Sequence, residues 1–591
     1  MINKRILIAS LVLVLLATLV SCGQGRAAKP SAPTLNLDYQ AVKVFNFSWT
    51  DVEGETGYKL FEDEDGSGNF VEAASIPADA SSYQLEVFLP AKVNARYKLA
   101  ACNEGGCSES AEVEVAVDQL VRAIGYFKAS NTDAWDEFGR HMALSADGNT
   151  LAVGAEYESS NATGINGNQS DNSAKYSGAV YVFAHDATGR WVQQAYIKAS
   201  NAETWDTFGE AVALSADGDT LVVGAPGEDS KAIGIGGDQS DNSLSGSGAV
   251  YVFVRDANDT WSQQAYIKAS NPGQDDDFGT SAYLSQDGNV LAVGAPREDA
   301  SATGGQNDNS ATDSGAVYVF TRNAAGSWNQ QAYIKASNAG AGDEFGNALS
   351  LAANGATLAV GAHLEDSNAA GVPGDNSAAD SGAVYVFGRS SGVWSQRAYL
   401  KASNAGSGDE FGYSVALADD GNTLAVGASR EDSNATGVNG DQNNNSSSDS
   451  GAAYIFTNRS GNWTQQAYIK ASNTDTADRF GFSVDITRDG MKVVACSPEE
   501  RSGATGINGI ENDNSGGGGA CYVFVSDGST WKQQAYIKAS NHSGYFGDWV
   551  AISGNGKTLA VSGSLERGGA KGIGGDLNDY SASASGAVYV Y

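Results

Sequence analysis

FGEAVALSADGDTLVVGAPGED (Phe208–Asp229), followed by SGAVYVF (Ser247–Phe253) and WSQQAYIKASN (Trp261–Asn271), is the fullest copy of a pattern that decides the fold of this 591-residue chain. The pattern occurs seven times, at intervals of 66 to 70 residues. A fixed period of this size indicates one supersecondary unit copied in series, with each copy burying its apolar face against its neighbours. The Phe-Gly pairs that mark the copies begin at Phe138, Phe208, Phe278, Phe345, Phe411, Phe480 and Phe546.

Each repeat carries four strand signals. In the second copy they are Ala211–Leu214, Leu221–Ala225, Ala249–Phe253 and a stretch from Trp261 to Lys268. Asp217-Gly218 joins the first two strands, and Asp-Gly and Asn-Gly pairs tolerate the positive φ of tight hairpins. Four antiparallel strands per unit, repeated radially, are typical of a β-propeller. We therefore expect an all-β chain whose residues 124–591 form a monomeric seven-bladed β-propeller.

The two ends of this region predict how the ring closes. The seventh repeat stops at its third strand, residues 587–591, and lacks a fourth. A spare copy of the fourth strand, residues 124–130, precedes the first repeat. It should complete the last blade and leave no open sheet edge. Turns after the first and third strands then lie on one face, the turn face, and loops after the second and fourth strands lie on the other, the loop face.

Phe208-Gly209 together with Gly224-Ala225-Pro226 resembles the FG-GAP repeats of integrin α-like propellers. The resemblance covers 124–591 and implies a propeller that binds or adheres to a protein or a glycan. Later copies depart from it, since Cys496-Ser497-Pro498 replaces Gly-Ala-Pro. The calcium-binding hairpin of integrin-like repeats is not matched either, because the corresponding hairpin here is only Ala216–Asp219.

The N-terminus is typical of an exported protein. Lys4 and Arg5 precede an apolar run, and Leu-Val-Ser-Cys at 19–22 resembles a bacterial lipobox that would leave Cys22 lipid-modified. Residues 1–22 are thus predicted to be a lipoprotein signal peptide. Residues 23–32 should be a linker, and the protein should be anchored to the membrane of the cell envelope, at the outer membrane or cell surface. An ordinary signal with a chance cysteine is the alternative.

Residues 33–118 differ from the repeats. Short alternating runs separated by Gly- and Asp-rich turns favour a small β-sandwich. The segment resembles a fibronectin type III domain, with Trp49 as its core tryptophan and Tyr97 as the tyrosine of a later strand. Because its connection enters strand 124–130, this domain should lie under the turn face, and the loop face should point away from the membrane.

Charge and cysteine content restrict the partners and the compartment. The formal net charge of −34 repels phosphate backbones and argues against nucleic-acid binding. Besides Cys22 there are four cysteines. Cys102 and Cys107 flank a turn, and Cys496 and Cys521 fall on strands that should be neighbours. Two disulfides are expected outside the cytoplasm.

Acidic residues collect on the predicted loop face. Carboxylate, amide and carbonyl oxygens in such loops are the ligands that Ca²⁺ prefers. Solvated loops stabilised by their own Asx-turns are the alternative. The candidate calcium ligands are Glu228, Asp229, Asp241, Glu298, Asp299, Asp308, Glu365, Asp366, Asp375, Glu431 and Asp432.

Two further observations bear on function. The tryptophans that begin the fourth strands could stack on a ligand, but packing against neighbouring strands is favoured. Four histidines in no repeated motif give no support for catalysis, and no nucleophile elbow or zinc-protease motif is present. We expect a surface lipoprotein that binds a protein or glycan on its acidic loop face and has no catalytic residues. The alternative is an extracellular enzyme acting on polysaccharide or phospholipid through the propeller face.

Overall fold

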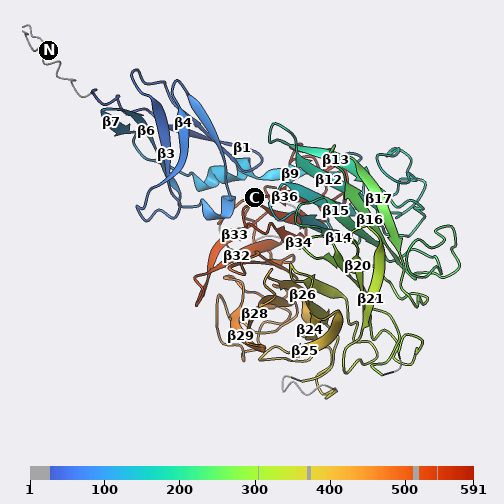
Figure 1. Ribbon diagram of the computed structural model, residues 1–591. Coiled ribbons are helices and arrows are strands. Elements are labelled where there is room, and N and C mark those ends of the chain that lie inside the picture. Colours follow the sequence, from blue (N-terminus) through green and yellow to red (C-terminus); the bar gives the residue numbers. More distant parts are fainter. Residues whose placement is uncertain (1–26, 304, 369–373, 510, 512–517, 542–543) are drawn as a thin grey trace, which may run out of the picture.

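The computed structural model describes residues 27–303, 305–368, 374–509, 511, 518–541 and 544–591 (Figure 1). The predicted signal peptide with Cys22 and the start of the 23–32 linker lie outside these residues. Among the residues described, no helix has the length and apolarity needed to cross a membrane.

The N-terminal region forms two antiparallel sheets that share a core (blue in Figure 1). Phe45, Phe47, Trp49 and Tyr97 are buried in it, and the rings of Phe47 and Tyr97 lie 4.8 Å apart. One sheet contains β1 (Asn36–Gln40), β2 (Val44–Ser48) and β5 (Ser82–Glu86). The other contains β4 (Val71–Pro77), β3 (Gly57–Asp63), β6 (Arg96–Asn103) and β7 (Gly106–Glu109), with β8 (Val113–Glu114) beside β6. The short helices η1 (Leu89–Ala91) and η2 (Val117–Ala123) follow β5 and β8.

The rest of the described chain forms seven four-stranded antiparallel sheets, which fit a β-propeller. Apolar residues fill both faces of the second strands, which are buried almost throughout. The first strands are β10 (Met142–Leu144), β14 (Ala211–Leu214), β18 (Ser281–Leu284), β22 (Ala348–Leu351), β26 (Phe411–Leu417), β30 (Ser483–Ile486) and β34 (Phe546–Ile552). The second strands are β11 (Thr150–Ala155), β15 (Thr220–Ala225), β19 (Val290–Ala295), β23 (Thr357–Ala362), β27 (Thr423–Ala428), β31 (Lys492–Ser497) and β35 (Leu559–Gly563).

The third and fourth strands complete each sheet, and the last sheet takes its fourth strand from ahead of the first repeat. The third strands are β12 (Ala179–His185), β16 (Ala249–Arg255), β20 (Ala316–Arg322), β24 (Ala383–Ser390), β28 (Ala452–Arg459), β32 (Ala520–Ser526) and β36 (Ala587–Val590). The fourth strands are β13 (Trp191–Ile197), β17 (Trp261–Ile267), β21 (Trp328–Ile334), β25 (Val393–Leu400), β29 (Asn462–Ile469), β33 (Trp531–Ile537) and β9 (Gly125–Phe127). Pairing of Tyr126 with Tyr589 confirms the predicted closing strand.

Backbone hydrogen bonds link the sheets into a closed ring. The turn after each first strand donates an N–H to the corresponding turn of the next sheet, and Asn555 of the last sheet donates to Ala146 of the first at 3.0 Å. Strands β10 and β34 are also in contact. The preceding links run from Ala146 to Ala216, Ala216 to Gln286, Gln286 to Ala353, Ala353 to Asp419, Asp419 to Arg488 and Arg488 to Gly554.

Close packing explains why Phe-Gly and Ser-Gly-Ala recur. Phe208 is fully buried, and its ring lies 5.4 Å from that of Tyr251. Gly248 has a φ of +74°, and a Cβ there would lie 2.1 Å from the carbonyl oxygen of Phe278 in the next repeat. A side chain at that position would push two sheets apart, so the glycine is required by the distance between repeats.

Both predicted disulfides are present. Cys102 and Cys107 join β6 to β7, and Cys496 and Cys521 join β31 to β32. The second bond connects residues that face each other across the ladder. In this sheet Cys496-Ser497-Pro498 stands in place of Gly-Ala-Pro.

The N-terminal region docks on the turn face, as its connection predicts. The buried Lys43 ammonium donates to Thr558 Oγ1 at 2.7 Å and to the Lys557 carbonyl at 3.0 Å, both at the first turn of the last sheet. Lys492, beside the same turn of the sixth sheet, lies 3.8 Å from the centre of the Phe88 ring. The loop after β31 also approaches this region, since a Cβ at Gly506 would lie 3.4 Å from Val121 of η2.

Candidate functional site

The glutamates predicted to bind calcium are buried and paired with lysines that follow the fourth strands. Glu228 is 1% exposed, and its carboxylate accepts hydrogen bonds from Lys268 at 2.7 Å, Tyr266 at 2.7 Å and Asn201 at 3.1 Å. Buried charges require such partners. The same ion pair occurs in every sheet: Glu158–Lys198, Glu228–Lys268, Glu298–Lys335, Glu365–Lys401, Glu431–Lys470, Glu500–Lys538 and Glu566–Lys128.

The candidate aspartates stabilise their own loops. Asp229 accepts the backbone N–H of Gly246, and Asp299, Asp366 and Asp432 do the same in their repeats. Asp241 accepts the N–H of Ser243, Asp308 the hydroxyl of Ser310, and Asp375 the amide of Asn368. Within the described residues, none of these candidates belongs to a group of three acids whose oxygens lie within 4.8 Å of one another.

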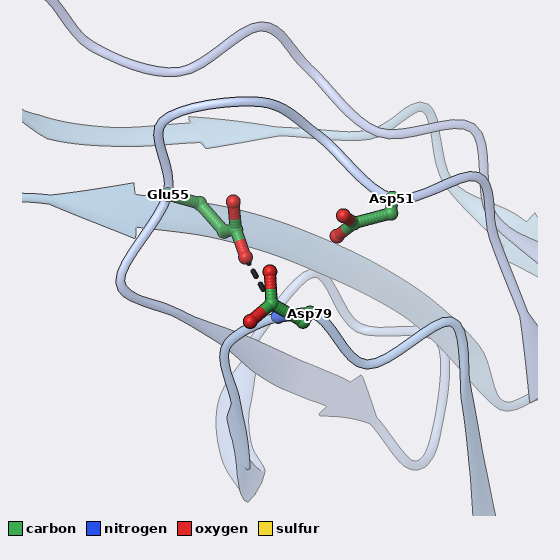
Figure 2. Close-up of side chains that lie close together, drawn as sticks. All are labelled: Asp51, Glu55 and Asp79. Carbon is green, nitrogen blue, oxygen red and sulfur yellow. Dashed lines mark hydrogen bonds between the residues drawn. The ribbon is translucent and has the colours of Figure 1, made fainter.

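One acidic group with that spacing lies in the N-terminal region, away from the predicted ligands. It consists of Asp51, Glu55 and Asp79, with Glu55 and Asp79 facing each other in Figure 2. Glu55 accepts the Asp79 N–H at 2.8 Å, and Asp51 accepts the Tyr58 hydroxyl at 2.7 Å. Two of the three side chains are exposed. The two hydrogen bonds stabilise the loops that carry these acids, and this explains why the acids lie close together.

The tryptophans that begin the fourth strands pack between sheets, as favoured from the sequence. Trp261 is buried and donates its indole N–H to Gln194 of the neighbouring sheet at 2.8 Å, while Arg255 lies 5.5 Å from its ring centre. Trp328 and Trp394 repeat the arrangement with Gln264 and Gln331. These rings are therefore not free to stack on a ligand.

A cavity of about 520 Å³ runs along the axis of the ring and is lined by the first strands of all seven sheets. Leucine, valine, alanine and isoleucine of the first strands line its middle, together with Tyr283 and Asp485. Near the turn face, Arg488 is paired with Asp419. Near the loop face, charged and aromatic side chains gather around the other end, which we call the mouth: Arg140, His141, Glu156, Tyr157, Glu210, Tyr413, Asp548 and Trp549.

The mouth contains a tightly packed charged group. Arg140 contacts Glu156 at 3.1 Å and Glu137 at 2.7 Å. Glu156 is only 2% exposed, and His141 Nδ1 lies 3.5 Å from its second carboxylate oxygen. That oxygen and that ring nitrogen therefore face each other in a contact that makes no hydrogen bond.

Carboxylates at the mouth have opposite pKa shifts. Burial, followed by the negative charge of Glu156, raises the pKa of Glu210 to about 8. Burial also acts against ionisation of Glu156, but its contacts with His141 and Arg140 outweigh burial and lower its pKa. Burial raises the pKa of Asp548 as well. The mouth thus brings together a carboxyl whose pKa is raised and one whose pKa is lowered, a combination found at sites that bind or transfer protons.

Sequence reasoning missed these residues because they break the repeat. The first position after each Phe-Gly pair differs in every copy, although the Phe-Gly itself is constant, and the second position is Ala or Ser in five of the seven copies. That contrast was the available signal. The seven pairs are Arg140-His141, Glu210-Ala211, Thr280-Ser281, Asn347-Ala348, Tyr413-Ser414, Phe482-Ser483 and Asp548-Trp549.

Aspartates of the loop face predict an unusual pH dependence. Asp206 accepts the Glu203 N–H at 2.7 Å, and burial raises its pKa to about 7. A pKa that folding raises contributes stability that is complete below the unfolded value, near 4, and is lost as the pH rises through about 7. Replacing Asp206 with Asn should therefore leave stability unchanged at pH 4 and raise it at pH 8 by about 1 kcal/mol or more. Denaturant unfolding at both pH values tests this, and destabilisation at pH 8 would contradict it.

Comparison with known proteins shows the family to which the chain belongs. A model described as an FG-GAP repeat matches residues 191–253, 261–320, 328–387, 394–456 and 463–524, together just over half of the chain. Each match runs from the fourth strand of one sheet to the third strand of the next. No curated protein matches the sequence.

Three solved structures show only weak similarity. A eukaryotic initiation factor is 10% identical over 90% of this chain and 98% of its own, with a TM-score of 0.33. An auxiliary nutrient binding protein from Bacteroides ovatus is 9% identical over 94% and 98%, with a TM-score of 0.29. A beta-1,2-glucanase from Parabacteroides distasonis is 20% identical over 16% and 14%, with a TM-score of 0.13. These scores carry no argument about function.

Proposed function

Because this chain belongs to the FG-GAP repeat family, we propose that it is a seven-bladed β-propeller of the bacterial cell envelope that binds a protein or glycan at the mouth of its central cavity. One observation carries the proposal. Repeats that are nearly identical at their structural positions differ at the positions that line one cavity. A cavity of this size with convergent polar groups is the usual form of a binding site.

The finer domain assignments belong to the same proposal. Residues 33–118 are a fibronectin type III-like sandwich, and Cys22 carries the lipid that anchors the mature monomer. The sandwich contacts the turn face, so an anchor ahead of it presents the mouth away from the membrane. Separating the membranes of cells that express the wild type or Cys22→Ser tests the anchor. An unchanged membrane fraction in the variant would contradict it.

Binding is tested with the mature chain on an array of matrix proteins and glycans. Glu210→Ala should weaken binding by about tenfold or more, because it removes a half-buried carboxyl that lines the mouth. Asp259→Ala is the matched control, since it removes a carboxyl from an exposed turn on the other face. Equal losses in both variants would exclude the mouth as the site.

A second candidate function rests on the opposite pKa shifts of Glu210 and Glu156. A protonated and an ionised carboxyl in one cavity can serve as general acid and general base in hydrolysis of a polysaccharide or a phospholipid. Release of reducing sugar or fatty acid that Glu210→Gln abolishes would establish this function. Binding without product would favour the first.

Calcium binding by the loop face stays a prediction, and the partly exposed aspartates such as Asp241, Asp308 and Asp375 are its best candidates. The candidate glutamates earlier in the same loops are already paired with lysine. If these loops bind Ca²⁺, chelation should lower the melting temperature, because a ligand that binds only the folded state stabilises it. An unchanged melting temperature in EDTA would contradict the prediction.

A further inference from the structure

The exposed large aromatic side chains of the described chain are concentrated in one sector of the loop face. All five lie in the seventh, first and second repeats, either in the loops after second and fourth strands or where a first strand begins. Scattered apolar residues are normal on a surface, but clustered ones mark an interaction site. They are Trp135, Trp205, Tyr545, Trp549 and Tyr580, and we call them, with Tyr157 and Tyr176, the aromatic sector.

Two of these tryptophans occupy backbone positions that are unfavourable for them. Trp135 has a φ of +72° and is 59% exposed, and Trp205 has a φ of +76° and is 56% exposed. Bulky residues rarely adopt this conformation. The equivalent positions of the third to sixth repeats hold Asp275, Gly342, Gly408 and Ala477, also with positive φ.

The strain at these positions is not needed for the fold. The Trp205 N–H donates to the Lys175 carbonyl, and Gly342 and Gly408 make the same backbone bond in their repeats. The backbone therefore keeps its conformation without an indole ring. A strained conformation that the fold does not require of a tryptophan indicates that the indole ring has a function.

The sector leads into the mouth. The Trp205 ring lies 4.5 Å from that of Tyr176, and Tyr176 lies 5.0 Å from Tyr157. Arg140 lies 5.8 Å from the centre of the Tyr157 ring, and both residues line the cavity. Across the mouth, Trp549 packs against His141 at 4.5 Å. Rings and charged groups therefore follow one another from the rim to the cavity.

We propose that the aromatic sector binds a neutral polysaccharide, whose sugar rings lie on Trp135 and Trp205 and whose end enters the mouth. This rests on the proposed binding function and names its ligand class. A pyranose ring presents C–H groups from one face, which pack on an aromatic ring, and hydroxyl groups at its edge, which hydrogen-bond to Lys175, Glu137 and Arg140. The net charge of −34 disfavours an anionic polymer.

The test uses native gels that contain soluble β-glucan, mannan or xylan, with alginate as the anionic polymer. We expect the wild-type mature chain to be retarded by at least one neutral polymer and not by alginate. Trp135→Gly and Trp205→Gly should each weaken the retardation by about tenfold in apparent Kd, as for tryptophans central to an interface. Trp135→Gly should keep or raise the melting temperature, which separates loss of the ring from misfolding. Val393→Ala, at an exposed apolar residue of the outer strand β25, should behave as wild type.

The outcomes distinguish polysaccharide binding by the aromatic sector from the proposed binding of a protein or glycan at the mouth. Retardation by a neutral polymer that both glycine variants retain would overturn the aromatic sector as the site, and so would retardation by alginate alone. Binding to a protein on the array that depends on Glu210 but not on Trp135 would overturn the polysaccharide and preserve the proposed function. If neither a protein nor a glycan binds, both proposals fail.

Discussion

A chain that begins at Thr132 should fail to form the ring, whereas one that begins at Gln119 should form it. The chain that begins at Thr132 lacks residues 119–131, and with them strand β9, which pairs with β36 as the fourth strand of the last sheet. It also lacks the buried Lys128, whose ammonium lies 2.8 Å from Glu566. The last sheet would be left with an open edge and an unpaired buried charge.

The expected loss is comparable to the stability of a whole domain. Tyr126 and Phe127 are buried, and each contributes about 1.5–3 kcal/mol by its burial. An unpaired buried carboxylate such as that of Glu566 costs about 3–5 kcal/mol. Domains are stable by only about 5–15 kcal/mol. Circular dichroism and size exclusion should therefore show an unfolded or aggregated chain.

A permuted chain provides the control. It begins at Thr132, continues to Tyr591, adds a copy of residues 254–264 and ends with residues 125–131. In the second sheet, residues 254–264 carry the chain from the third strand to the equivalent place in the fourth. This chain should melt as the one that begins at Gln119 does. If the simple deletion melts at the same temperature as either, closure by β9 is not what holds the ring together.

The closing strand was predictable because it is a regular feature. A period of 66 to 70 residues fixes the four strands of each repeat, and a fourth-strand sequence left over at one end matches the one missing at the other. Turn residues such as Asp217-Gly218 and the disulfide partners Cys496 and Cys521 follow from the same register. Local chemistry and the repeat agree at these positions, so reasoning from the repeat alone reaches the observed pairing.

The buried ion pairs of the repeated glutamates were not predicted, because a sequence does not show which side chains are buried. Glu228 is followed by an aspartate in an acidic loop, which favours an exposed cation ligand. The available signal lay in the fourth strand, where a lysine recurs in YIKASN at 36 to 40 residues from the glutamate. A metal site has no need of a lysine in every repeat, whereas a buried ion pair does.

The mouth and the aromatic sector were missed for the opposite reason. Their residues, such as Glu210 and Trp205, stand where the repeat is not kept. A single copy gives no sign that position 210 faces an axis shared by seven sheets. Only closure of the ring brings His141 of the first repeat beside Trp549 of the last.

Replacing Lys268 with Met should destabilise the protein by about 3–5 kcal/mol, the second of the two largest effects. Lys268 has no exposed surface, and its ammonium also lies 2.8 Å from the Ser247 hydroxyl. The substitution leaves Glu228 buried with its negative charge uncompensated. Denaturant unfolding measures the loss, and a change below 1 kcal/mol would contradict a structural role for the pair.

Two matched variants decide whether charge is the cause. Lys59 and Glu72 in the N-terminal region form an ion pair of the same length, 2.7 Å, but both side chains are substantially exposed. Lys59→Met should cost less than about 1 kcal/mol, because solvent screens an exposed pair. In the double variant Glu228→Gln, Lys268→Met, the amide still accepts a hydrogen bond from Tyr266, so most of the stability should return. If the double variant is as unstable as Lys268→Met, the loss arises from the packing of the lysine stem and not from the buried charge.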